Sequence, residues 1–118
     1  MTLNEIAAII DLDLERVVAL FMGREEMYIK FLRKFPDNAR RLLGELAEAV
    51  GNKNHEAIEA AAHGIKGVAS NLGVTNVTAL STDLMLDIRE HRPDQIDDHY
   101  EQLVLETNKA ITYIEQLD

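Results

Sequence analysis

Apolar residues recur three or four positions apart along almost the whole chain, which is the spacing of one face of an α-helix. The clearest case is an apolar stripe formed by Tyr28, Leu32, Phe35, Ala39, Leu42, Leu46 and Val50. No stretch alternates apolar and polar residues for long enough to indicate a strand. The pattern therefore predicts an all-α protein.

Residues that begin or end helices divide this pattern near the N-terminus. Thr2 and Glu5 have the spacing of a capping box and predict a short helix through about residue 10. A second short helix is expected between a cap at Asp11 or Asp13 and a stop at Gly23. These two segments are too short to supply the main core, so we expect them to precede it.

Four longer segments follow. The first covers residues 24–50 and ends at Gly51, and Pro36 should kink it or split it in two because proline removes a backbone donor and clashes with the preceding turn. The second covers residues 54–72 and ends at Gly73. The third runs from a cap at Thr75 to about residue 91, and the last has Pro93 in its first turn and reaches about residue 117.

Short links between amphipathic helices make antiparallel neighbours. We therefore expect an antiparallel four-helix bundle with one or two short N-terminal helices. The length of 118 residues suits one domain, so residues 1–118 are predicted to form a single unit.

Composition narrows the function classes. The net charge of −9, with no basic stripe, argues against binding to nucleic acid. No apolar run approaches membrane-spanning length, the N-terminus lacks the basic residues of a signal peptide, and there is no cysteine. We expect a cytoplasmic protein whose partner is another protein. A monomer is the simplest expectation.

The segment 59–73, EAAAHGIKGVASNLG, departs from what helix stability alone would select. Its apolar residues fall on one face, and the opposite face is predicted to carry Glu59, His63, Lys66, Gly67 and Ser70. Gly64 and Gly67 each cost a helix roughly 1 kcal/mol relative to alanine. Close helix packing would explain the glycines, and each of these residues alone is ordinary. Their combination on the outer face favours a functional site.

The chemistry available on this face suits transfer of a phosphoryl group. An imidazole with an ordinary pKa of about 6.5 is largely neutral at pH 7 and is nucleophilic without a neighbouring base. Lys66, one turn after His63, can balance the charge of a group attached to the imidazole, and Gly67 leaves room for another protein. No glycine-rich phosphate loop or metal-binding carboxylate cluster is visible.

Residues 63–73, HGIKGVASNLG, resemble the H-x-[LI]-K-G-x-[AS]-x-x-[LIV]-G motif of histidine-containing phosphotransfer (HPt) domains. The segment 31–35, with Leu42 and Leu46 in the helix after it, is similar to the opening helices of that family. Two positions depart from the family pattern: Val68 stands where many relatives have serine or alanine, and Met85 where some have a glutamine near the histidine. Arg89 resembles a basic position of the family.

The resemblance implies that His63 accepts a phosphoryl group from an aspartate of a receiver domain and returns it to another. It implies that Lys66 supports the phosphoryl charge and that Gly67 gives access. The expected partners are response-regulator receiver domains and a sensor or hybrid histidine kinase. No cofactor is expected on this chain, because Mg²⁺ belongs to the receiver, and the protein would be a phosphocarrier without kinase activity of its own.

Two other interpretations remain open. The first is a metal-binding bundle, suggested by the i,i+4 pair Glu59 and His63 together with three further histidines, His55, His91 and His99. The sequence, however, lacks the Glu-x-x-His repeats typical of di-metal bundles. The second is an adaptor that binds a receiver or a helix without phosphotransfer.

Two groups of charged residues lie outside the motif. Arg33, Lys34, Arg40 and Arg41 are expected to form a solvated face, some of which could line the rim that meets an acidic receiver. Asp94, Asp97 and Asp98 are explained by the start of the last helix better than by a metal site.

Overall fold

The computed structural model describes residues 1–118 and consists of helices joined by short links. The helices are α1 (Leu3–Ile10), α2 (Leu14–Leu20), α3 (Glu25–Leu32), α4 (Phe35–Gly51), α5 (His55–Leu72), α6 (Thr75–Arg89), the 3₁₀ turn η1 (Pro93–Gln95) and α7 (Ile96–Ile114). This confirms the all-α prediction.

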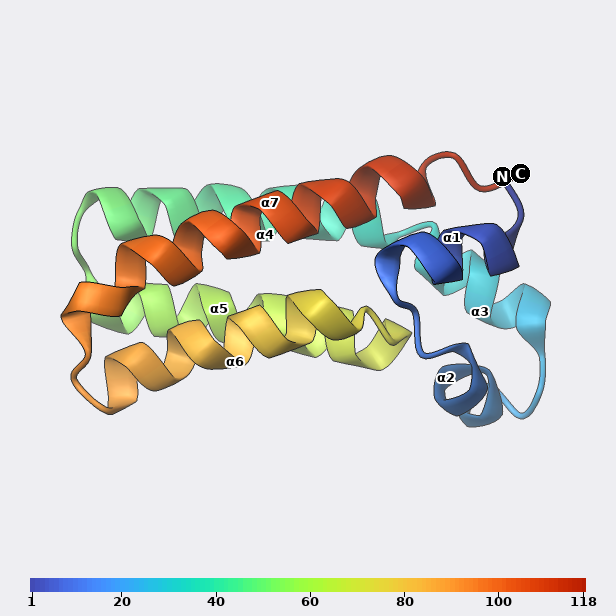
Figure 1. Ribbon diagram of the computed structural model, residues 1–118, viewed down its shortest axis with the longest axis horizontal. Helices are drawn as coiled ribbons and strands as arrows, with labels where there is room; N and C mark the ends of the chain where they lie inside the picture. Colours follow the sequence, from blue (N-terminus) through green and yellow to red (C-terminus); the bar gives the residue numbers. More distant parts are fainter.

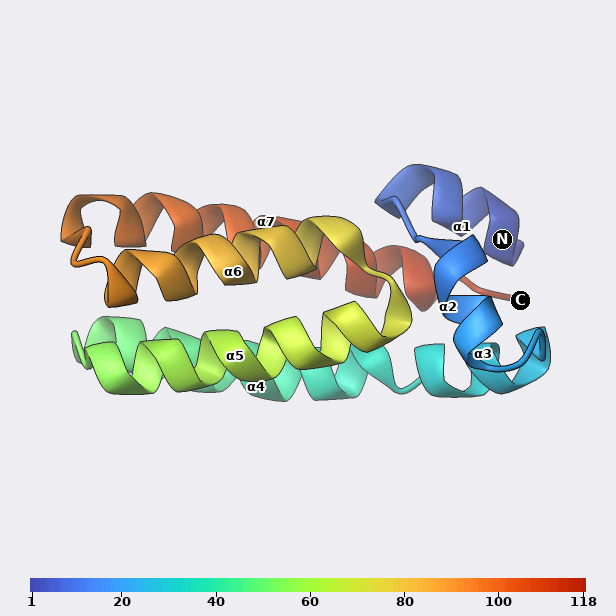
Figure 2. The same ribbon diagram turned by 90° about the horizontal axis from the view of Figure 1, so that it is seen from below.

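The four long helices α4 to α7 form the predicted antiparallel bundle (Figures 1 and 2). Each packs against the next along the chain, and α7 closes the bundle by packing against α4. α5 therefore lies diagonally across the bundle from α7. The molecule is elongated, with extents of 41 × 23 × 19 Å.

The short helices α1, α2 and α3 gather at one end of the bundle, where α5 ends and α6 begins (Figure 2). Both chain termini lie at this end (Figure 1). The N-terminal ammonium group is 3.0 Å from the Asp118 carboxylate, and the amide of Asp118 donates to the carbonyl of Met1. We call the three helices the N-terminal layer, residues 3–32.

Several predicted helix ends are confirmed. Thr2 and Glu5 form the reciprocal capping box of α1. Asn54 caps α5 by accepting from the amide of Ala57 at 3.1 Å. α5 ends as predicted at Gly73, whose φ of 76° belongs to the left-handed region that glycine adopts without strain.

Pro36 splits the segment 24–50 rather than kinking it. α3 ends at Leu32 and α4 begins at Phe35, which places Pro36 in the first turn of α4, where its missing amide would have no partner within the helix. The apolar stripe of this segment is buried on both sides of the break, except for Val50, which is half-buried. The packing of the stripe therefore survives the change of helix.

Several predicted boundaries differ from the structure. Thr75 is not a cap: Val74 occupies that position, and the Thr75 hydroxyl bonds the Asp11 carbonyl instead. α6 ends at Arg89 and not near residue 91. Gly51 is the last residue of α4, as predicted, and the positive φ that follows belongs to Lys53. Pro93 begins a separate 3₁₀ turn, so the last helix starts at Ile96, and it ends at Ile114 rather than near residue 117.

Twenty-eight buried apolar residues form one continuous core that runs through the bundle and under the N-terminal layer. Its largest fully buried side chains include Tyr28, Phe35, Ile58 and Leu84, so all parts of the chain contribute. None of the helices combines the length and apolarity needed to cross a lipid bilayer.

Candidate functional site

The helix α5 presents the predicted site on its outer side. Its apolar positions Ile58, Ala62, Ile65, Ala69 and Leu72 are all buried against the bundle, as the helical spacing predicted. His63 is exposed, and so are Gly67 and Asn71, which follow it at intervals of about one turn. The imidazole of His63 makes no hydrogen bond or ion pair within the chain. It is therefore open to a partner.

The two glycines that follow this histidine, Gly64 and Gly67, serve different purposes. A Cβ atom on Gly64 would lie 2.9 Å from Cδ2 of Leu42, so the absence of a side chain lets α5 pack closely on α4. A Cβ atom on Gly67 would meet nothing within 4 Å. Close packing therefore explains Gly64, whereas no contact within the molecule accounts for Gly67.

The charged neighbours of His63 differ in their pairing. Lys66 is half-buried and forms no ion pair. Glu59, one turn before His63, is held by Arg89 of α6, whose Nε lies 2.6 Å from the Glu59 carboxylate. Arg89 thus neutralises the one carboxylate on this part of α5. Lys66 remains the unpaired cation beside the histidine.

The other residues considered for the site lie apart from it or make structural contacts. Met85 is buried, and no polar group of α6 is hydrogen-bonded to His63. His99 lies with its Nδ1 2.5 Å from the buried carboxylate of Asp87, which joins α7 to α6. His55 and His91 are exposed. The structure contains no group of three or more His, Asp or Glu side chains placed to hold a metal ion.

The C-terminal end of α5 is bonded to the N-terminal layer, which the sequence did not predict. The hydroxyl of Tyr28 donates to the carbonyl of Leu72 at 2.6 Å, and Arg16 donates to the carbonyl of Ser70 at 3.0 Å. Both carbonyls belong to the last helical turn, and that of Ser70 also accepts from the amide of the capping residue Gly73. The pKa of Tyr28 is raised by burial of its ring.

A surface groove of about 440 Å³ lies where α5 meets the N-terminal layer. We call it the N-terminal groove. Its lining consists of Leu20, Phe21 and Phe31 from the layer, Lys34 and Asn38 at the start of α4, and Val68, Asn71 and Leu72 from α5. Phe21 stacks against Phe31 with ring centroids 5.5 Å apart. The groove is continuous along α5 with the exposed row that begins at His63.

The structure divides the four cations that were expected to form a solvated face, some of them at the rim that meets a receiver. Arg33 donates to the carbonyls of Leu117 and Asp118, and Arg40 forms a two-bonded ion pair with Glu115 that lowers the pKa of that carboxyl. Arg41 lies 3.6 Å from Glu45 within α4. Lys34 alone borders the N-terminal groove, where its Nζ lies 5.2 Å from the centre of the Phe31 ring.

A family model described as the Hpt domain matches residues 30–116, well over half of the chain. The chain belongs to the Hpt domain family. This confirms the resemblance drawn from the sequence, and it connects the helical bundle with phosphotransfer in phosphorelays. The match contains all of α4 to α7 but leaves out α1, α2 and most of α3.

Two curated relatives of this Hpt domain bear the name "Sensory/regulatory protein RpfC" and come from two strains of Xanthomonas campestris pv. campestris. Each is 35% identical over 72 residues, which is 61% of this chain and 10% of the relative. The chain therefore spans about a tenth of the length of the relatives it matches. No solved structure matches it.

Proposed function

We propose that this Hpt domain carries a phosphoryl group on His63 between aspartates of receiver domains in a two-component phosphorelay. The observation that carries the proposal is the surface around His63. An exposed imidazole stands beside an unpaired lysine and a glycine that no internal contact requires, on the outer side of α5.

The transfer uses groups of the two proteins together with the Mg²⁺ expected on the receiver. The lone pair of the neutral imidazole attacks the phosphorus atom of the aspartyl phosphate. A nitrogen–phosphorus bond forms while the bond to the aspartate oxygen breaks, and the carboxylate leaves with its electron pair. The phosphohistidine keeps the proton on its other ring nitrogen or loses it to water. The reverse step passes the group to a second aspartate, and Mg²⁺ on the receiver supports both steps.

Lys66 and Gly67 serve this transfer in different ways. The Lys66 ammonium group carries no other ion pair, so it can approach the phosphoryl oxygens on His63, which lies one turn earlier. The Arg89–Glu59 pair reduces the repulsion that a free carboxylate would exert on the incoming group. The bare backbone at Gly67 lets the surface of the receiver come close to the imidazole.

The protein then acts as a phosphocarrier, and the kinase activity belongs to a sensor or hybrid histidine kinase that begins the relay. We also propose that the protein is cytoplasmic and that residues 1–118 form one domain. We propose a monomer, since one bundle leaves His63 free for a partner.

The deciding experiment mixes the purified protein with phosphorylated receiver domains and follows the phosphoryl group, with His63→Gln as the control. Phosphoramidate, a small phosphodonor, is used in parallel because it needs no docking. We expect acid-labile label on the native protein and none on His63→Gln. A folded native protein that takes label from neither source would overturn the proposal and favour an adaptor that only binds.

A further inference from the structure

The N-terminal groove has apolar walls that remain open to solvent. Leu20 is 65% exposed and Phe31 is 42% exposed, although both are large apolar side chains. Met22, in the turn between α2 and α3, is 89% exposed. Three of the five exposed large apolar residues of the chain thus lie within residues 20–31. Clustering of this kind on a small protein indicates a contact surface.

The walls of the groove are held in place before any partner arrives. Tyr28 and Arg16 bond the last carbonyls of α5, and the amide of Asp13 donates to the carbonyl of Gly73 at 2.9 Å. These bonds attach the N-terminal layer to the helix that carries His63. A partner that enters the groove does not have to order it first, which lowers the entropic cost of binding.

The groove lies within reach of any protein that docks on His63. At a rise of 1.5 Å per residue, Val68 to Leu72 lie roughly 8 to 14 Å along α5 from His63. An interface of ordinary size buries about 800 Å² on each partner, a patch of roughly 16 Å radius. A receiver centred on His63 therefore reaches the α5 side of the groove as well.

The charges at this surface match an acidic partner. The chain as a whole is acidic, with 21 acidic and 12 basic residues, yet the groove is lined by one charged residue, and that residue is Lys34. Lys66, beside His63, is a second cation with no acidic partner in the chain. A receiver presents a carboxylate-rich phosphorylation pocket to His63, so its acidic surface meets these two lysines.

The apolar wall is also a feature of this chain beyond the Hpt family model. Leu20 and Phe21 lie before residue 30, where the family match begins. They are therefore placed to distinguish receivers that meet the same histidine helix.

We propose that the N-terminal groove binds an apolar side chain of the receiver domain and that α2 and α3 thereby select which receiver is served. The proposal rests on the proposed function, because it takes a receiver as the occupant. Leu20 and Phe31 would act as the central apolar contacts, and Lys34 as the charged edge.

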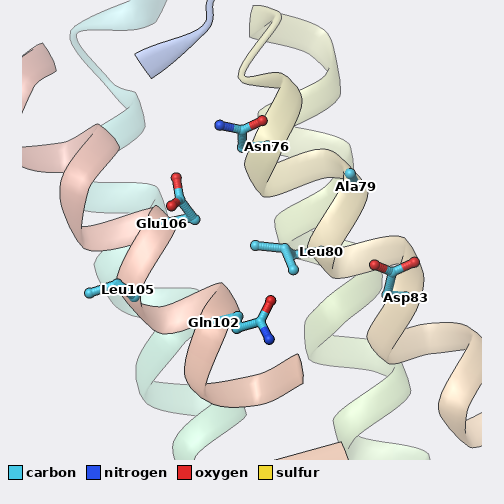
Figure 3. Close-up of a pocket in the computed structure, with 7 residues that line it drawn as sticks. All are labelled: Asn76, Ala79, Leu80, Asp83, Gln102, Leu105 and Glu106. Atoms are coloured by element: carbon cyan, nitrogen blue, oxygen red, sulfur yellow. The ribbon is translucent and has the colours of Figure 1, made fainter. Parts of the chain in front are cut away.

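The test compares Leu20→Asp with Leu105→Asp. Leu105 is the matched control because it is 68% exposed on α7, diagonally across the bundle from α5, and lines a separate groove with Leu80, Asp83 and Glu106 (Figure 3). Both variants add the same charge at an exposed leucine, so both should fold, which circular dichroism and thermal unfolding verify. Leu20→Met is the conservative variant that keeps the apolar contact.

Receiver domains from the same genome are first profiled for phosphotransfer, and the fastest serves as the probe. We expect Leu20→Asp to lower kcat/KM for transfer from this receiver by about tenfold or more, the size of a central interface contact. The kcat/KM values of Leu20→Met and Leu105→Asp for this transfer should stay within about twofold of the native value. Labelling of His63 by phosphoramidate should be unchanged in all three, since that donor is too small to use the groove.

Two results would overturn the proposal while the proposed function stands. One is native transfer rates in Leu20→Asp, and the other is an equal loss in Leu105→Asp, which would indicate a general effect of charge. Absence of label on native His63 from both donors is a different result. It would remove the phosphocarrier function and, with it, the receiver as occupant of the groove.

Discussion

Gly64 and Gly67 show how adjacent turns of one helix can serve packing and access separately. Both glycines weaken the helix by roughly the same amount, because each adds backbone freedom to the unfolded chain. The benefit differs. Gly64 allows Leu42 of α4 to approach to 2.9 Å from the position of a Cβ atom, whereas the space above Gly67 is empty. The cost at Gly67 is therefore not offset within the folded molecule.

A stability measurement on two alanine variants tests this difference. Gly67→Ala should raise the free energy of unfolding by about 0.5–1 kcal/mol, since the new methyl group meets only solvent. Gly64→Ala should gain less, because Leu42 must shift to make room. Urea unfolding of both variants measures the two values. Equal stabilisation would mean that Gly64 has no packing role.

At the same scale, the motif residues could be named from the sequence but their surroundings could not. His63, Lys66 and Gly67 were placed on the outer side of one helix by helical spacing alone. The pairing of Glu59 with Arg89 joins residues thirty positions apart, and no local pattern indicates it. The same holds for Thr75, whose hydroxyl found a carbonyl of another segment instead of capping its own helix.

At the scale of elements, the decisive feature is the attachment of α3 to the end of α5. Tyr28 is fully buried, and its hydroxyl donates to the carbonyl of Leu72. Its ring also contacts Phe21 with centroids 5.8 Å apart. One side chain thus joins α2, α3 and α5. The apolar stripe predicted that Tyr28 would be buried, but it did not indicate where the hydroxyl would bond.

Tyr28→Phe should lower the free energy of unfolding by about 1–2 kcal/mol at neutral pH, because a buried hydrogen bond is lost. This difference should shrink as the pH rises above 10. The unfolded phenol ionises near its ordinary pKa of 10.0, whereas burial raises the pKa of the folded one, so the native protein loses stability there. Urea unfolding of both proteins at pH 7, 9 and 11 checks this. A difference that grows with pH would contradict it.

The division of residues 24–50 belongs to the same scale. Proline chemistry predicted a disturbance at Pro36, and two outcomes were open: a kink or a split. The split places Pro36 in the first turn of α4, where it costs no hydrogen bond, and lets α3 turn toward α5. Which outcome occurred was decided by the contacts of α3 with other elements.

At the scale of the whole molecule, the charge of −9 dominates the electrostatics. Several ion pairs are exposed and isolated, such as Arg41 with Glu45 and Arg16 with Asp13. Pairs of this kind contribute little to stability. The excess of carboxylates instead repels itself within the compact state.

Added salt should therefore stabilise this protein. Raising NaCl from 10 to 150 mM screens the self-repulsion and should increase the free energy of unfolding by less than about 1 kcal/mol. Thermal or urea unfolding at several NaCl concentrations across that range, at constant pH, measures how the free energy of unfolding changes with salt. A fall in stability with salt would show that the ion pairs contribute more than the repulsion costs.

The sequence by itself determined the helices, their inner faces, the bundle class and the identity of the exposed histidine motif. These follow from periodicity and from residue chemistry, both of which act between neighbours in the chain. The tertiary structure alone decided how the N-terminal layer sits on the end of α5, where the groove opens and which cations are already paired. Those features depend on contacts between residues far apart in the chain, whose geometry is set only when all the helices pack together.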